Sequence, residues 1–307
     1  MVTNVYSLPN EILVNILSSF STVELLPLTV VSHRFYALIC RILHFRLLVA
    51  APIPSRHLIL ECYHPTSRLS SPYAFCTYLG TDGLSAEYNG KGSIYENCEV
   101  TERLGRLCGL YSRFRPHVQV EESLQLLQSS EQTSGASVTD TNTVSVEGNN
   151  RVREQGQTNT ASVRRLVSLE GGEGFSQLCI VVDLVKVKEG SGLLLSVTTV
   201  EDGVIRLWRD WLKERSKGDQ DNEEEGVLWV GSAKHVGLKL RVREQRWNRN
   251  APILVHRDEE PAVSYDVDIE EIWIRTIRLL ITIERSMQEQ ENSSNAVIVG
   301  AVRRPNE

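Results

Sequence analysis

Three cationic side chains alternate with aliphatic ones between Leu238 and Arg243, and they are the chain's most distinct candidate for ligand chemistry. If this stretch is a β-strand, Lys239, Arg241 and Arg243 share one face, because successive residues of a strand point to opposite sides. Guanidinium groups bind carboxylates and phosphates through paired hydrogen bonds. We therefore predict a surface that receives an acidic or phosphorylated segment, beside the aromatic ring of Trp247. The alternative is a solvent-facing sheet surface without a ligand, since exposed ion patches often contribute little.

Patterns that would indicate catalysis or a metal site are weak or missing from the sequence. The glycine cluster at 171–174 lacks the Lys-Ser/Thr pair of a P-loop and is better explained as a turn. The seven histidines are scattered without an HExxH pattern, and no GxSxG sequence supplies a hydrolase nucleophile. The glutamates at 223–225 are expected in a solvated loop, and Glu270 and Glu271 at the turn that ends a strand. We predict no catalytic residue, no metal ligand and no cofactor.

The composition is typical of a globular intracellular protein. Of 307 residues, 41% are hydrophobic, so a sizeable core is possible, and the net charge of −6 does not favour a nucleic-acid partner. None of the six cysteines forms a CxxC pair, and no run reaches the ~18 apolar residues of a membrane span. The polar sequence at 9–11 also interrupts the place where a signal peptide needs an apolar stretch. We expect free and mostly buried thiols, no membrane partner, and a location in the cytoplasm or nucleus.

The N-terminal stretch 8–43 reads as a series of short amphipathic helices. Pro9 suits a first helical turn, and apolar residues recur at helical spacing over 12–20. Ser21-Thr22-Val23-Glu24 has the pattern of a capping box, and Pro27 fits best where a new helical turn begins. A unit this small buries too little apolar surface to fold alone, so we expect it to need another surface.

The order LPxEIL, a leucine-rich turn and VVSHRF resembles an F-box, over residues 1–50. F-box proteins use this motif to dock on the Skp-type adaptor of a cullin–RING ubiquitin ligase, while the rest of the chain selects the substrate. Phe35 stands where Trp is frequent, and Pro27 departs from the usual second helix. The resemblance implies an adaptor-binding face formed by Leu8, Pro9, Ile12, Leu13, Ile16, Leu25, Leu28, Val31, Phe35 and Leu38.

After residue 55 the pattern changes from helical to strand-like. One short helix is predicted from Ile205, Trp208 and Leu212, and this spacing favours a buried Trp208. Many short strands with few helices favour an antiparallel sandwich or barrel, hence an α+β fold. The strand candidates have a period of two or form apolar runs bounded by turn residues, and they are 57–63, 73–79, 180–187, 193–200, 227–230, 237–242, 262–269, 279–283 and 296–302.

A polar stretch, 128–163, interrupts the strands. It is dominated by Ser, Thr, Asn, Gln and Gly, and we expect it to be a disordered insertion or linker. The β-rich substrate-recognition region then comprises 51–127 and 164–307. Stretches such as FSQLC and PAVSYDV are similar to the C-terminal region of fungal F-box proteins.

These observations favour a non-catalytic substrate-recognition subunit of an SCF-type (cullin–RING) ubiquitin ligase. Its expected partners are the Skp-type adaptor, through it a cullin–RING ligase, and an unknown protein substrate. The alternative is a glycan- or ligand-binding β-sandwich module whose N-terminal helices are incidental. An enzyme is least favoured, because no nucleophile, metal cluster or cofactor loop is recognisable.

Overall fold

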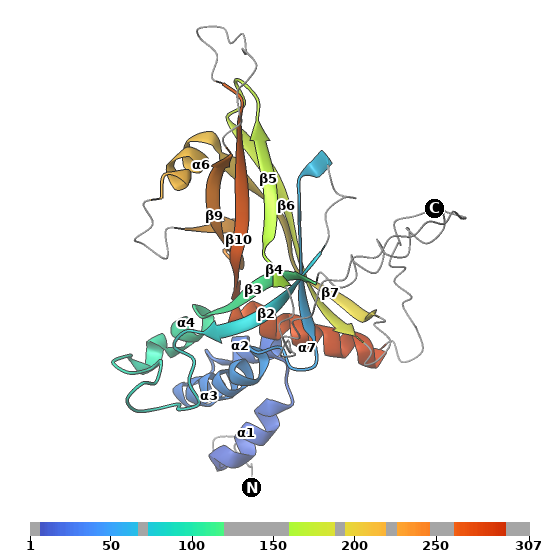
Figure 1. Cartoon of the computed structure of the whole chain (residues 1–307). Coiled ribbons are helices and arrows are strands. Elements are labelled where there is room, and N and C mark those ends of the chain that lie inside the picture. Colours follow the sequence, from blue (N-terminus) through green and yellow to red (C-terminus); the bar gives the residue numbers. More distant parts are fainter. Residues whose placement is uncertain are drawn as a thin grey trace, which may run out of the picture.

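The structure, a computed structural model, describes residues 7–66, 73–119, 160–187, 194–218, 226–245 and 261–292. Three N-terminal helices are followed by a rolled, antiparallel sheet, and the last helix, α7, contacts both (Figure 1). This arrangement confirms the predicted α+β class, with a nearly closed barrel-like sheet after the N-terminal helices.

The N-terminal unit consists of α1 (Asn10–Ser18), α2 (Thr22–Leu28) and α3 (His33–Ala50). The predicted capping box is present at the start of α2. The Glu24 N–H donates to Ser21 Oγ at 3.4 Å, and the Ser21 N–H donates to Glu24 Oε2 at 2.8 Å. Two N–H groups that lack helical partners are thereby satisfied, which fixes where α2 begins.

Pro27 lies in the last turn of α2, so the prediction that a new helical turn begins there is wrong. The helix has already started at the capping box. Proline has no N–H for the backbone ladder, and α2 ends one residue later, at Leu28.

Two arginines of α3 hold the two ends of α1. Arg34 Nε donates to Asn10 Oδ1 at 2.8 Å, at the first residue of the helix. Arg46 Nη2 donates to the carbonyl groups of Ser18, the last residue of α1, at 3.0 Å and of Phe20, just after it, at 2.7 Å. The carbonyls at a helix C-terminus lack backbone partners and carry partial negative charge, so a guanidinium there stabilises α1.

The strands form one ten-stranded sheet with the order β7-β6-β1-β2-β3-β10-β9-β8, while β4 pairs with β3 and β5 pairs with β10. The strands are β1 (His57–Tyr63), β2 (Ala74–Thr81), β3 (Tyr111–Gln119), β4 (Thr160–Ala161), β5 (Val163–Leu169), β6 (Phe175–Val187), β7 (Leu194–Trp208), β8 (Val227–Val230), β9 (Val236–Gln245) and β10 (Val263–Arg275). The short helices between strands are η3 (Val100–Glu102), α4 (Arg103–Cys108) and α6 (Arg209–Ser216).

Strand β10 organises the sheet, because it pairs with β9 on one side and with two strands in succession on the other. Its first part pairs with β5 and its last part with β3. The register to β9 shifts between Ile269 and Glu271, at the point where the partner on the opposite side changes. The prediction that Glu270 and Glu271 end the strand is therefore wrong: they form a β-bulge, and the strand continues.

The two terminal strands of the sheet order, β7 and β8, approach each other at Gly203. A Cβ atom at Gly203 would lie 2.6 Å from Val230 Cγ1, so a larger residue would push the strands apart. The described residues contain no backbone hydrogen bond between β7 and β8, and the barrel is therefore nearly closed rather than closed.

Helix α7 (Thr276–Asn292) follows β10 directly, and the prediction of a strand at 279–283 is wrong. The buried side chains of Leu279, Leu280, Ile283 and Ser286 have the spacing of one helix face. The run LLITI at 279–283 satisfies a period of two as well, so its sequence alone did not decide between the two structures.

The carboxylate of Glu284 on α7 joins α7 to the N-terminal unit. It accepts hydrogen bonds from the Thr22 N–H at 2.7 Å and Thr22 Oγ1 at 2.8 Å, and it forms an ion pair with Arg46 Nη1 at 3.1 Å. The N-terminal unit was expected to need another surface, and part of that surface is α7 of the same chain.

The helix predicted around IRLWRDWL starts only at Arg209, since Ile205 and Leu207 are buried within strand β7. Trp208 is 52% exposed, which contradicts the expectation that it is buried. On the strand, Trp208 is exposed and packs against Phe175 of β6, with the ring centroids 5.0 Å apart and the ring planes tilted by 53°.

Other predicted elements match closely or lie outside the described residues. The bounds predicted for β1 and β8 agree with the structure. Most of the polar stretch 128–163 and the candidate strand 296–302 lie outside the described residues, whereas Thr160–Ala161 forms β4 and Val163 begins β5.

We expect Glu284→Ala to lower the free energy of unfolding by about 1–2 kcal/mol, because it leaves the half-buried donors of Thr22 and Arg46 without an acceptor. Urea denaturation measures this change. Arg285→Ala is the matched control: its ion pair with Glu289 is exposed, and we expect a change below about 0.5 kcal/mol. Equal effects of the two substitutions would contradict the role given to Glu284.

The buried ring of His44 should make the free energy of unfolding fall in mild acid. Its ring is buried, with Nε2 3.0 Å from the Ser85 carbonyl oxygen and Nδ1 3.3 Å from Tyr95 Oη. Burial lowers the pKa of His44, partly offset by the hydrogen bond to Ser85. The unfolded chain therefore binds the proton more readily, and stability falls as pH drops from about 7 to 5. His44→Gln should reduce this slope in urea titrations at several pH values; an unchanged slope would contradict the assignment.

Candidate functional sites: an apolar docking face and a charged groove

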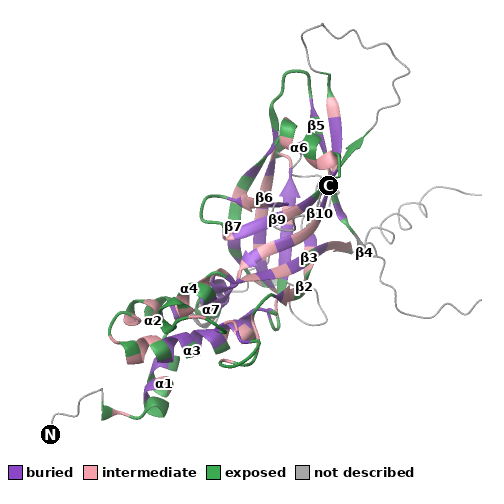
Figure 2. Cartoon of the chain, turned by 90° about the vertical axis from the view of Figure 1, so that its left-hand side faces the viewer, coloured by how far each residue is buried: buried purple, intermediate pink, exposed green. Residues whose placement is uncertain are grey.

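The N-terminal unit exposes large apolar side chains of α1. Figure 2 colours the exposed parts of this helix green. Ile12 is 45% exposed and Ile16 is 47% exposed, one helical turn apart. Pro9 is exposed before them, and Val31 is 49% exposed between α2 and α3. We call these four residues the docking face. Large exposed apolar side chains on a small unit mark a candidate protein-binding site.

The other six residues of the predicted adaptor-binding set differ in exposure. Leu8, Leu28 and Phe35 are half-buried and border the docking face, while Leu13, Leu25 and Leu38 are buried. The buried leucines pack the three helices together, so they shape the face without presenting their side chains. Exposed apolar residues that the sequence analysis did not include are Phe20, Val23 and Val30.

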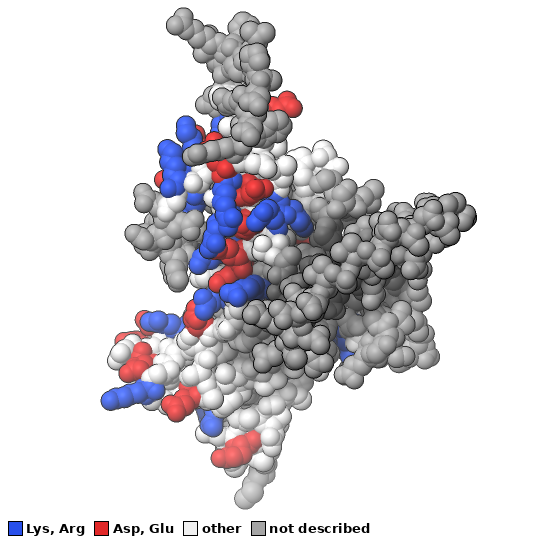
Figure 3. Space-filling model, viewed as in Figure 1, with Lys and Arg blue, Asp and Glu red and all other residues white. Residues whose placement is uncertain are grey.

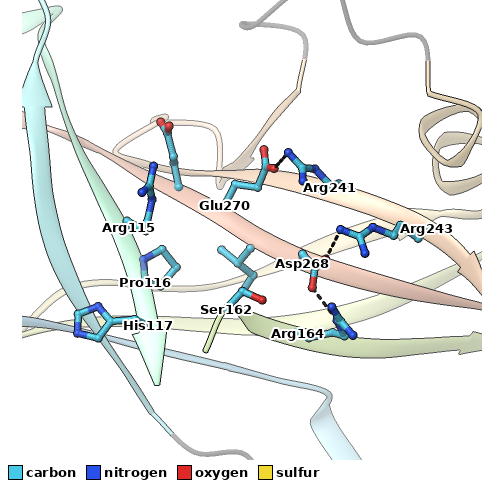
Figure 4. Close-up of a pocket in the computed structure, with 11 residues that line it drawn as sticks. Arg115, Pro116, His117, Ser162, Arg164, Arg241, Arg243, Asp268 and Glu270 are labelled. Carbon is cyan, nitrogen blue, oxygen red and sulfur yellow. Dashed lines mark hydrogen bonds and ion pairs between the residues drawn. The ribbon is translucent and has the colours of Figure 1, made fainter. Parts of the chain in front are cut away.

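The cationic residues of β9 lie beside a groove of about 420 Å³ on the outside of the sheet (Figure 4). Leu238, Leu240 and Val242 are buried, which confirms the predicted alternation along the strand. Arg241 and Arg243 line the groove. It is completed by β3, β5 and β10, near the β-bulge where β10 changes partner.

Carboxylates of β10 neutralise part of this groove. Asp268, only 6% exposed, pairs with Arg164 Nε at 2.8 Å and with Arg243 Nη2 at 3.4 Å, and Glu270 pairs with Arg241. The hydrogen bond that Arg164 donates to Asp268 raises the pKa of Arg164 above its ordinary value. Figure 3 shows the resulting mixture of basic and acidic side chains over β9 and β10. The cationic face expected from β9 is thus a mixed-charge surface.

Capacity to bind an anion nevertheless remains. Arg164 and Arg243 share the single carboxylate of Asp268, so neither has a carboxylate to itself. Arg115, from β3, is exposed at the groove and has no ion pair within the described ranges. Guanidinium groups with unused donors are suited to carboxylates and phosphates.

Of the four predicted substrate-binding residues, the structure places Arg241 and Arg243 at the groove. Lys239 lies on the same face as Arg241, opposite Glu271, but does not line the groove, and Trp247 lies outside the described residues. Asp268 was missed as a partner of these cations. Its alternation with apolar neighbours indicated an outward face, but only the register to β9 shows which cations it meets.

Metal, thiol and membrane chemistry gain no support from the described part of the chain. It contains no cluster of three or more His, Cys, Asp or Glu residues suited to a metal ion, and none of its helices is long and apolar enough to cross a membrane. All six cysteines are free as expected, although only Cys40 and Cys62 are fully buried. Burial raises the pKa of Cys40 to about 11 and that of Cys62 to about 12, so both thiols stay protonated near neutral pH.

Comparison with known proteins places the N-terminal unit in a family. No curated protein and no solved structure matches the chain, and the similarity of its C-terminal region to fungal F-box proteins stays a prediction. Residues 5–49 match the family model described as F-box-like, and this range contains α1, α2 and nearly all of α3. The chain therefore carries an F-box-like domain at residues 5–49.

Proposed function

We propose that this protein is the substrate-recognition subunit of an SCF-type ubiquitin ligase and acts inside the cell. The observation that carries this proposal is the F-box-like unit with its pair Ile12 and Ile16, which are about half exposed among the described residues. A Skp-type adaptor covers this docking face, and the adaptor links the protein to a cullin–RING ligase. A standard interface of this kind buries about 800 Å² on each partner.

The receptor makes and breaks no bonds in this role. It holds a target near the ligase, so that ubiquitin transfer proceeds at a high effective concentration. Two connections restrict how the target region moves relative to the docking face: α7 follows β10 without a loop, and Glu284 of α7 binds α2 and α3. A target bound on β10 is therefore held in a limited range of positions relative to the adaptor.

We propose that the charged groove is the target-binding site, and that it receives an acidic or phosphorylated segment. The support is the unused donor capacity of Arg115 and of the Arg164–Asp268–Arg243 cluster. Some of these arginines must exchange a carboxylate of β10 for the anion of the target. Such an exchange favours a ligand with more charge or better bidentate geometry than a single carboxylate, which a phosphate group provides.

The docking face predicts the outcome of an adaptor co-purification. Because Ile12 and Ile16 are about half exposed, Ile12→Asp combined with Ile16→Asp should leave the fold intact and place two charges in the interface. We expect the adaptor to be lost from the purified complex, with an unchanged circular dichroism spectrum. Val204→Asp, at a 48% exposed apolar site on β7, is the control and should retain the adaptor. Adaptor retention by the double variant would refute the assignment.

The groove predicts which variant loses its targets. Proteins that accumulate on the chain when the proteasome is blocked can be quantified by mass spectrometry. Arg115→Ala combined with Arg243→Ala should remove a subset of these proteins, and phosphatase treatment of the lysate should remove the same subset if the anion is a phosphate. Arg285→Ala, an exposed arginine on α7, should keep them. The adaptor should remain bound throughout, and an unchanged set of proteins would contradict the groove's role.

A further inference from the structure

A pocket lined by two tryptophans lies where β7 and β8, the terminal strands of the sheet order, approach each other. Its volume is about 560 Å³, and Trp208 of β7 and Trp229 of β8 line it together with Leu228. Trp208 is 52% exposed and Trp229 is half-buried. Tryptophan is among the residues enriched at the energetic centres of protein interfaces. We call this site the tryptophan pocket, and neither the docking face nor the charged groove includes it.

A row of aromatic rings leads from the tryptophan pocket to the charged groove. The ring centroid of Trp229 lies 5.0 Å from that of Tyr111 on β3, which lies 6.4 Å from that of Trp273 on β10. The indole N–H of Trp273 donates to Glu271 Oε2 at 3.1 Å, and Glu271 lines the charged groove. We call Trp229, Tyr111 and Trp273 the aromatic row. It joins the pocket and the groove along the outer face of the sheet.

Gly237 allows the aromatic row to cross β9. This residue pairs with Trp229 on one side and with Trp273 on the other. A Cβ atom at Gly237 would lie 2.8 Å from Trp229 Cε3 and 2.9 Å from Trp229 Cζ3. The indole of Trp229 therefore occupies space that the side chain of any other residue at this position would take.

The polar atoms of the aromatic row are largely engaged within the protein. Tyr111 Oη donates to the Lys234 carbonyl oxygen at 2.9 Å and accepts from Arg275 Nη2 at 3.1 Å, and the Trp273 N–H is bound to Glu271. Tyr111 and Trp273 therefore offer a ligand their ring faces rather than hydrogen bonds. Such faces suit a flat apolar side chain, which stacks on them, better than a sugar, whose hydroxyl groups would lose hydrogen bonds to water.

A single extended peptide is long enough to contact both sites. From Glu271 to Trp229 the path runs two residues along the strands, about 7 Å, and two strands across, about 10 Å, which gives a diagonal of about 12 Å. From Asp268, five residues before Trp273 on β10, the diagonal to Trp229 is about 19 Å. An extended chain rises by about 3.3 Å per residue and covers these distances in about four to six residues.

We propose that the target segment has two contact points: its anion binds the charged groove, and an aromatic or proline ring about four to six residues away fills the tryptophan pocket. This inference rests on the proposed function of the groove and specifies its substrate class. An anion alone must compete with Asp268 and Glu270 for the arginines. The ring adds a contact that no carboxylate of the sheet replaces, so it distinguishes a target from other acidic segments.

Selection from degenerate peptide libraries tests the second contact. The probes carry either a fixed phosphoserine or a fixed pair of aspartates, with random residues at seven positions on each side, and the purified full-length chain selects from them. Sequencing by mass spectrometry should show Phe, Tyr, Trp or Pro enriched four to six positions from the anion, by roughly 2- to 12-fold for one stacked ring.

Two variants and a control assign this preference to the pocket. Trp208→Ala should abolish the ring preference and keep anion binding, because its exposed ring can be removed without disturbing the core. Trp229→Ala should reproduce this loss. Phe45→Ala, which removes a 44% exposed ring on α3, is the matched control and should keep the preference.

The possible outcomes separate this inference from the proposed function. Anion-selected peptides without a ring preference, or a ring preference that survives in Trp208→Ala, would overturn the inference and leave the role of the groove intact. If neither library is retained above an uncharged library with serine at the fixed positions, the role of the groove fails, and the two-point contact fails with it.

Discussion

The carboxylate of Glu284 is the contact on which the arrangement of this protein depends. It lies at the meeting point of three helices, where it accepts from the backbone and hydroxyl of Thr22 and pairs with Arg46. Arg46 in turn binds carbonyl groups at the C-terminal end of α1. One half-buried anion therefore organises α1, α2 and α3 against α7, and α7 continues the central strand β10. Other polar contacts also join the unit to the rest of the chain, such as those of His44 on α3 with Ser85 and Tyr95, but among the described residues none of them reaches α1, α2 and α7 together.

The sheet shows how neighbouring strands alter the meaning of a sequence pattern. Taken alone, β9 presents Lys239, Arg241 and Arg243 on one face. In the folded protein, β10 places Asp268 and Glu270 against the two arginines, and β3 and β5 add further cations. The surface is therefore close to balanced in charge. In the proposed role, selectivity for a ligand would come from the donors that the carboxylates leave unused, rather than from net charge.

Local sequence patterns predicted much of the fold because several of them are compatible with one local structure only. The capping box at Ser21 and the alternation along β9 each depend on neighbouring residues only, and both are present in the structure. Predictions were wrong where two structures satisfy the same pattern. The apolar run at 279–283 suits a strand or a helix, and the spacing of Ile205 and Trp208 arises by chance on a strand. The groove required the register between β9 and β10, which no local pattern contains.

The contact between Thr22 and Glu284 also has a consequence for the time course of synthesis. The two residues are separated by 262 positions, so the ribosome completes the F-box-like helices long before it makes α7. At 5–20 residues per second, this interval lasts roughly 13–52 s. During it, the helices have neither the Glu284 carboxylate nor the apolar face of α7, and a unit of this size is marginal by itself. The nascent chain therefore exposes both its docking face and the side meant for α7, so early capture by an adaptor or a chaperone would protect it until the last helix emerges.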